Sequence, residues 1–166
     1  MTQARQAGAD AVLARSRFTA AMPALLQQYA RISDREQVND ACAQPLSPLA
    51  RQGIVLFNEG QYYQCHDALE TAWRQDQTPG RDLYRAILQI GIALYQIKKG
   101  NQRGAVKMLM RVRQWLADLP AVCRGVDVAG LRRMVDEVET AVHALPPDQL
   151  DQFDWNIIPA IKLPDR

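Results

Sequence analysis

Apolar side chains recur every three or four residues along most of the chain, which is the spacing of helices with one buried face. The pattern predicts three core helices, over residues 61–75, 82–98 and 102–119. The middle helix is apolar around most of its circumference, so we expect it at the centre of a bundle. Flanking helices are predicted over residues 9–31 (with a break near Pro23), 48–58 and 131–145.

Short polar motifs predict where these helices begin and end. Ser47-Pro48 places a capping hydroxyl before a proline at the first helical position. Gly60 supplies a left-handed turn after the helix over 48–58. Gly100-Asn101 ends one core helix and caps the next, which makes the two helices antiparallel neighbours. The fold class is therefore all-α: a compact bundle of three core helices with flanking N- and C-terminal helices.

Three regions are expected along the chain. Residues 1–46 form an N-terminal helical extension followed by a polar linker over 32–45, and residues 47–145 form the helical bundle. Residues 146–166 form a C-terminal tail that is too apolar around Phe153-Asp154-Trp155 to stay in water. We expect this tail to lie across the bundle or to dock on a second subunit.

Composition narrows the class of protein without identifying an activity. The chain has 166 residues, 48% of them hydrophobic and 23% charged, and a net charge of +2 that is too small to argue for nucleic acid by itself. No apolar run approaches the roughly 20 residues of a membrane span, and the first residues do not resemble a secretory signal. The three scattered cysteines, Cys42, Cys65 and Cys123, are expected to be reduced thiols in a cytoplasmic protein.

A small polar cluster is predicted on the first core helix. His66 falls inside the apolar stripe that runs from Tyr62 to Trp73, and Glu70 lies four residues further on the same side, while Asp67 points more towards solvent. The favoured interpretation is a core histidine satisfied by Glu70, because buried polar groups are nearly always paired. The alternatives are a general base oriented by a carboxylate, or two metal ligands.

The metal alternative has little support in the rest of the chain. His66 and His143 are the two histidines, and the sequence has no His-Glu-x-x-His, no Cys-x-x-Cys and no repeated Glu-x-x-His motif. We therefore expect no metal and no cofactor.

Gln89 is one of the polar residues on the apolar middle helix, where it shares a narrow side with Arg85. A buried glutamine needs hydrogen-bond partners, so Gln89 either joins the His66–Glu70 cluster or faces a loop or water. Candidate binding residues are Trp73, Gln89 and Asn101.

These residues carry a resemblance to a known family. The pattern Phe57-x-x-Gly-x-Tyr-Tyr-x-x-His-Asp-x-x-Glu-x-x-Trp, then Gln89 and Lys-Lys-Gly-Asn101, resembles the family called domain of unknown function 309, over about residues 50–119. The family usually has glutamate where this chain has Asp67, which keeps the charge and shortens the side chain. The resemblance implies a small helical bundle and no established reaction.

A basic face is predicted on the third core helix, where Arg103, Lys107 and Arg111 recur at four-residue steps. A solvated helix face is the favoured interpretation, and a phosphate-contacting face is the alternative. No aromatic residues interleave with these charges, so a platform for stacking bases is not indicated.

The function that these features favour is a small helical binding or scaffold domain, with a small polar ligand or a second copy of the chain as possible partners. A hydrolase or acid–base enzyme, metal-assisted or not, that uses His66, Glu70 and Asp67 is the first alternative. A nucleic-acid-associated protein that uses the basic face is the second alternative, and we expect no binding to nucleic acid.

Overall fold

The computed structural model describes residues 17–22 and 34–164. Residues 17–22 are helical, and the rest of the helix predicted over 9–31 lies outside the described residues. A separate compact unit spans Ser33–Arg166. The architecture below is that of this unit.

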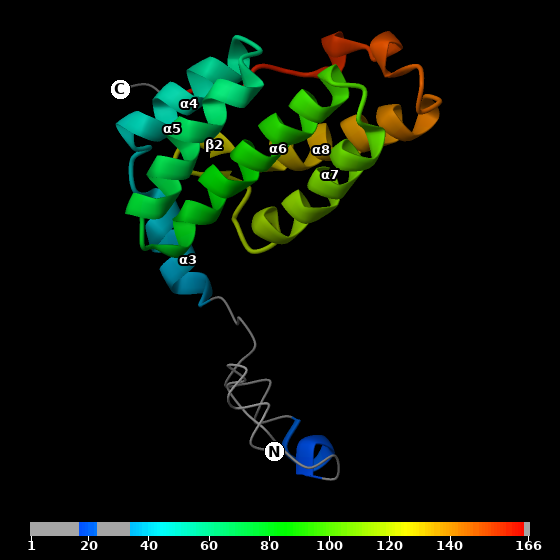
Figure 1. The fold of residues 1–166 in the computed structure, drawn as a ribbon. Coiled ribbons are helices and arrows are strands. Elements are labelled where there is room, and N and C mark those ends of the chain that lie inside the picture. Colours follow the sequence, from blue (N-terminus) through cyan, green and yellow to red (C-terminus); the bar gives the residue numbers. More distant parts are fainter. Residues whose placement is uncertain (1–16, 23–33, 165–166) are drawn as a thin grey trace. The chain divides into compact units, whose positions relative to one another are not determined.

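Five long helices build the bundle (Figure 1). They are α4 (Pro48–Asn58), α5 (Tyr62–Gln75), α6 (Asp82–Lys98), α7 (Gln102–Leu116) and α8 (Val128–Ala144). Helix α6 is central: α5 and α7 pack along it, α4 packs on α5, and α8 packs on α7. Nine residues of α6 are buried, which confirms the position predicted from its nearly continuous apolar surface. The all-α bundle is thus the fold of this chain.

The predicted helix ends are confirmed by their hydrogen bonds. The Ser47 hydroxyl accepts a bond from the backbone N–H of Ala50 at 3.2 Å, ahead of Pro48 at the first position of α4. Gly60 has a φ of 72°, the left-handed conformation that glycine adopts without a Cβ clash. The Asn101 side chain accepts from the N–H of Gly104 at 2.9 Å and so caps α7.

Two glycines allow the helices to approach closely. A Cβ atom on Gly53 of α4 would lie 2.5 Å from Cγ of Leu69 on α5, and a Cβ atom on Gly91 of α6 would lie 2.8 Å from Sγ of Cys65. Both distances are far below van der Waals contact, so the packing of α5 against its two neighbours requires glycine at these positions.

One further helix, α3 (Arg35–Ala43), occupies the stretch that the sequence predicted to be a polar linker. Asp34 caps it by accepting a hydrogen bond from the N–H of Glu36 at 3.0 Å. The prediction was wrong because α3 buries only Val38, Ala41 and Cys42. Three apolar positions in nine residues are too few to give a clear helical period.

The cysteine prediction was also wrong for two of the three residues. Cys42 of α3 forms a disulfide with Cys123, and 81 positions separate them in the sequence. Cys123 belongs to a two-residue strand, β1 (Val122–Cys123), which pairs antiparallel with β2 (Val126–Asp127) ahead of α8. Cys65 is free and fully buried, as predicted.

The C-terminal tail lies on the bundle. It contains two short 3-10 helices, η2 (Leu150–Gln152) and η3 (Trp155–Ile157), and buries Phe153 and Ile161. The side chain of Asn58 fixes its end, because Nδ2 donates to the Ile161 carbonyl at 2.9 Å and Oδ1 accepts from the Ile161 N–H at 2.8 Å. Within the described residues, no helix combines the length and the apolar character needed to cross a bilayer.

Candidate functional site

His66 lies on the surface side of α5 and not in the core. Its side chain is 33% exposed, and Nδ1 lies 3.3 Å from Oδ1 of Asp67, whose side chain is 84% exposed. The prediction of a buried core histidine was therefore wrong. Helix α5 buries Tyr62, Cys65, Leu69 and Ala72, a narrower stripe than the sequence predicted.

Glu70 also has a different partner from the one predicted. Its Oε1 accepts a hydrogen bond from Arg74 at 2.8 Å, one turn further along α5. At i,i+4 spacing, Glu70 can pair with His66, four residues before it, or with Arg74, four residues after it. The guanidinium is always charged and reaches further, so it forms the pair. Among the described residues, His66 and Glu70 do not hydrogen-bond to each other.

Gln89 and Asn101 do not complete a site around His66. The Trp115 Nε1–H of α7 donates to Oε1 of Gln89 at 3.1 Å, so the partner of Gln89 is neither the predicted cluster nor a loop. Asn101 caps α7 and donates from Nδ2 to Oε1 of Gln96 at 2.8 Å. His66, Glu70, Gln89 and Asn101 therefore each have a separate partner and do not meet in one site.

A stack of aromatic rings and guanidinium groups joins α5, α6 and α7 instead. The guanidinium carbon of Arg85 lies 3.8 Å from the centre of the Trp115 ring and 4.8 Å from that of the Trp73 ring. Arg81 lies 5.5 Å from the Trp73 ring on the same corner. Such contacts each contribute about 0.5–2 kcal/mol. We name Trp73, Arg85 and Trp115 the tryptophan–arginine stack.

The stack was missed because it brings together residues from three helices. Its sequence signal was the polar side of α6, where Arg85 and Gln89 interrupt an otherwise apolar surface. Trp73, predicted to be a core residue, is only partly buried, and its Nε1 atom is buried without a hydrogen-bond partner in the described part of the chain.

Cys65 is not a nucleophile, and the described residues do not form a cluster of metal ligands. Burial raises the pKa of the Cys65 thiol to about 12, and its Sγ donates to the Tyr62 carbonyl at 3.0 Å, so the thiolate nucleophile does not form at neutral pH. No group of three or more His, Cys, Asp or Glu side chains in residues 17–22 and 34–164 is placed to hold a metal ion. The expectation that the protein carries no metal stays a prediction.

The predicted basic face is present on α7. Arg103, Lys107 and Arg111 are exposed, and Met110 beside them is 63% exposed. Within the described part of the chain, these three basic side chains form no ion pair. Arg113 of the same helix differs, because it pairs with Asp136 and Glu139 of α8. We name Arg103, Lys107, Met110 and Arg111 the α7 face.

The exposure of His66 and Glu70 leads to a first expected result. His66→Ala and Glu70→Ala should each lower the free energy of unfolding by less than about 1 kcal/mol, because half-exposed ion pairs contribute little. Leu69→Ala on the same helix is the control: its side chain is fully buried, so the loss should be about 2–5 kcal/mol. Denaturant unfolding measures all three. A loss above about 2 kcal/mol for Glu70→Ala would restore the interpretation of a buried His66–Glu70 pair.

Part of this bundle is similar in sequence to known proteins. The model of the family described as "Domain of unknown function (DUF309)" matches residues 50–108. An uncharacterized protein of Aquifex aeolicus (strain VF5) is 25% identical over 91 residues, which are 54% of this chain and 27% of that protein. The chain thus spans about a quarter of the length of this relative, and neither description states a reaction. From α4 to the first half of α7, the chain resembles the DUF309 family, as the sequence motifs predicted.

Proposed function

We propose that this protein is a binding module that docks an acidic segment of a partner protein on the α7 face. The observation that carries the proposal is a row of three basic side chains without ion-pair partners among the described residues, next to an exposed methionine. A partner segment of matching chemistry has carboxylates at helical spacing and one apolar side chain that covers Met110.

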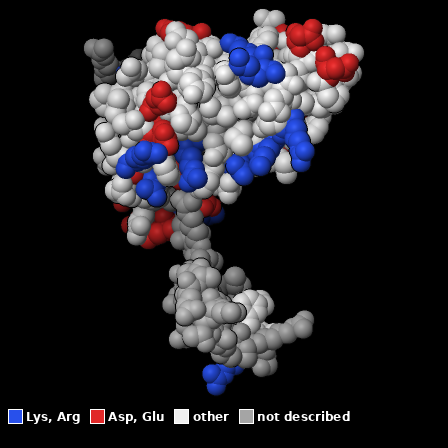
Figure 2. Space-filling view, viewed as in Figure 1, with Lys and Arg blue, Asp and Glu red and all other residues white. Residues whose placement is uncertain are grey.

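The distribution of charge supports an acidic partner. Residues 82–116 contain seven Lys or Arg residues and one Asp, whereas residues 127–154 contain seven Asp or Glu residues and two Arg. The net charge of +2 conceals this separation. Figure 2 shows Lys and Arg side chains in a row over the helix that Figure 1 labels α7, and Asp and Glu side chains near the C-terminal tail. Separated charge of this kind raises association rates with an oppositely charged partner.

Met110 favours a protein partner over nucleic acid. Phosphate contacts need cations and hydrogen-bond donors, and an apolar side chain beside the basic row adds nothing to them. Methionine and arginine are enriched at the centres of protein interfaces. The rings of Trp73 and Trp115, which bases would need for stacking, are partly buried and covered by Arg85.

The length of the Aquifex aeolicus relative also supports a module. The matched region makes up 27% of that protein, so a region similar in sequence to this chain is part of a longer chain there. The acid–base alternative has less support than the binding module, because Glu70 pairs with Arg74 and not with His66.

A cytoplasmic location belongs to the same proposal. Stable disulfides are rare in the cytosol, where those that occur are usually catalytic or redox-sensing. In a cytoplasmic binding module, we therefore expect the Cys42–Cys123 disulfide to be a bond that forms and breaks with redox conditions.

Fluorescence anisotropy with two labelled probes tests the proposal. The first is a helical peptide of about 15 residues with Glu at four-residue steps and one central Leu, and the second is a single-stranded DNA of the same charge. We expect the peptide to bind at low salt, with an affinity that falls as salt is added because the charges are exposed. Arg103→Glu with Arg111→Glu should abolish this binding, and Met110→Ala should weaken it.

The matched control is Arg133→Glu with Lys162→Glu, which changes the net charge equally but alters α8 and the C-terminal tail. These residues are exposed, and the control should bind the peptide as the unaltered protein does. Equal loss of binding in both double variants would mean that only total charge matters. Tighter binding of the DNA than of the peptide would replace the protein partner with nucleic acid.

A further inference from the structure

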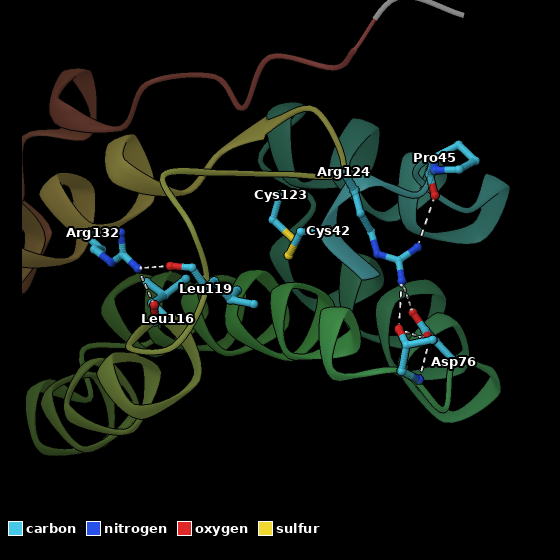
Figure 3. The surroundings of a disulfide bond; sticks show 9 residues. Cys42, Pro45, Asp76, Leu116, Leu119, Cys123, Arg124 and Arg132 are labelled. Carbon is cyan, nitrogen blue, oxygen red and sulfur yellow. Dashed lines mark hydrogen bonds and ion pairs between the residues drawn. A yellow bond between two sulfur atoms is a disulfide. The ribbon is translucent and has the colours of Figure 1, made fainter. Parts of the chain in front are cut away.

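The Cys42–Cys123 disulfide adds a covalent cross-link between α3 and β1, beyond the peptide chain that leads from α3 to α4 (Figure 3). Cys123 is fully buried and Cys42 is 6% exposed, so the bond lies beneath the surface where α3 meets β1. The third cysteine, Cys65, lies on α5 and remains a thiol.

Arg124, the residue after Cys123, reinforces the same junction. Its backbone N–H donates to the Cys42 carbonyl at 2.6 Å, and its guanidinium donates to the Pro45 carbonyl at 3.1 Å. The guanidinium also donates to Asp76 at 2.7 Å and to Thr78 at 3.0 Å (Figure 3 draws these contacts). The disulfide and the Arg124 N–H thus hold the end of α3, and the Arg124 guanidinium holds the segment that follows it.

Helix α3 has few other contacts of its own. It has nine residues, and its buried side chains are Val38, Ala41 and Cys42. Isolated helices of this length are unstable in water, so α3 depends on its attachment. The cross-link keeps α3 near its docking surface, on η1 (Pro79–Arg81) and β1, even when the weaker contacts open.

Most of the core belongs to the remaining helices, and Val38 and Cys42 of α3 lie at its edge in the same hydrophobic cluster. Leu83, Ile87, Ile90, Leu94 and Ile97 of α6 are at most 1% exposed. These residues belong to the central helix α6, which packs between α5 and α7, whereas α3 packs on η1 and β1. We therefore expect the packing around α6 to persist when α3 detaches.

We propose that Cys42–Cys123 is a redox modification site that controls the attachment of α3. When local opening of α3 exposes the buried bond, a dithiol reductant attacks one sulfur of the disulfide and forms a mixed disulfide, and its second thiol then completes the exchange. The products are two cysteine thiols in the protein and one oxidised dithiol, so two electrons and two protons are transferred. In the reduced protein α3 detaches from η1 and β1, while α4 to α8 stay folded.

Hydrogen–deuterium exchange of the full chain, with and without dithiothreitol, tests this proposal. We expect the backbone amides of residues 35–43 to exchange more than about tenfold faster after reduction, because the cross-link no longer restrains local opening of α3. Residues 83–97 should keep their protection. The variant Cys42→Ser with Cys123→Ser should reproduce the reduced pattern without reductant, and Cys65→Ala should keep the oxidised pattern.

Three results would overturn the proposal. The first is equal protection of residues 35–43 in both redox states. The second is loss of protection in residues 83–97 to the same extent as in residues 35–43, which would make the disulfide a staple of the whole fold. The third is a count of three free thiols in protein isolated without reductant. If the double serine variant does not fold, the titration of the unaltered protein with dithiothreitol decides between these outcomes.

Discussion

Arg124→Met should lower the free energy of unfolding by about 3–5 kcal/mol. Arg124 is 8% exposed, and its guanidinium forms an ion pair at 2.7 Å with Asp76, whose side chain is 14% exposed. Methionine fills a similar volume but leaves the Asp76 carboxylate buried without its positive partner, and that desolvated charge is the main cost. The Pro45 carbonyl also loses its donor. Urea unfolding monitored by circular dichroism measures the change.

Two further variants separate this cause from a simple loss of packing. Arg124→Met with Asp76→Asn should cost less than the sum of the single changes, because the neutral amide removes the stranded charge. Arg113→Met is the surface comparison: Arg113 also pairs with carboxylates, but its side chain is 51% exposed, so the cost should stay below about 1 kcal/mol. A similar loss for Arg113→Met and Arg124→Met would show that burial does not decide the cost.

Phe57→Ala should have a comparable effect, about 3–5 kcal/mol, through a cavity. Phe57 is the first residue of the family motif and is 1% exposed at the end of α4. The centres of the Phe57 and Tyr62 rings lie 5.3 Å apart in an edge-to-face arrangement, and the Phe57 ring lies beside Gly91, at the point where α4, α5 and α6 come together. The close packing around Gly91 leaves little freedom to fill the space. Thermal and urea unfolding both measure the loss.

Trp73→Ala and Phe57→Leu are the comparisons for this result. Trp73, the last residue of the same motif, is only partly buried under Arg81 and Arg85, so its removal should cost less than that of Phe57. Phe57→Leu keeps most of the volume and should cost less than about 1.5 kcal/mol. A larger loss for Trp73→Ala than for Phe57→Ala would mean that the tryptophan–arginine stack, and not the buried ring, holds the motif together.

The sequence predicted the helices of the bundle well because local chemistry determines where they begin and end. Ser47, Gly60 and Asn101 each satisfy backbone groups within a few residues, so their roles can be recognised without the tertiary structure. Helix α6 was equally clear, because a helix that is apolar on nearly every side has to be enclosed by others.

The candidate site was harder to predict because it depends on pairings between helices. The i,i+4 rule allowed Glu70 to pair with His66 or with Arg74, and it does not select between them. Gln89 was correctly expected to need a partner, but the partner, Trp115, comes from another helix. The disulfide was missed for the same reason: the spacing of Cys42 and Cys123 carries no information about two segments that meet only in the folded chain.

The disulfide also changes how the chain carries mechanical tension. It closes a covalent ring that contains the whole family-matched segment, residues 50–108. A pull on the two ends of the protein passes from Cys42 directly to Cys123 and bypasses α4, α5, α6 and α7. While the disulfide is intact, the 81 residue steps inside the ring cannot be extended by this pull. Their contour length is roughly 270–290 Å. Reduction places those four helices under load, so the same bond that attaches α3 also determines whether the bundle resists force as a closed ring or as an open chain.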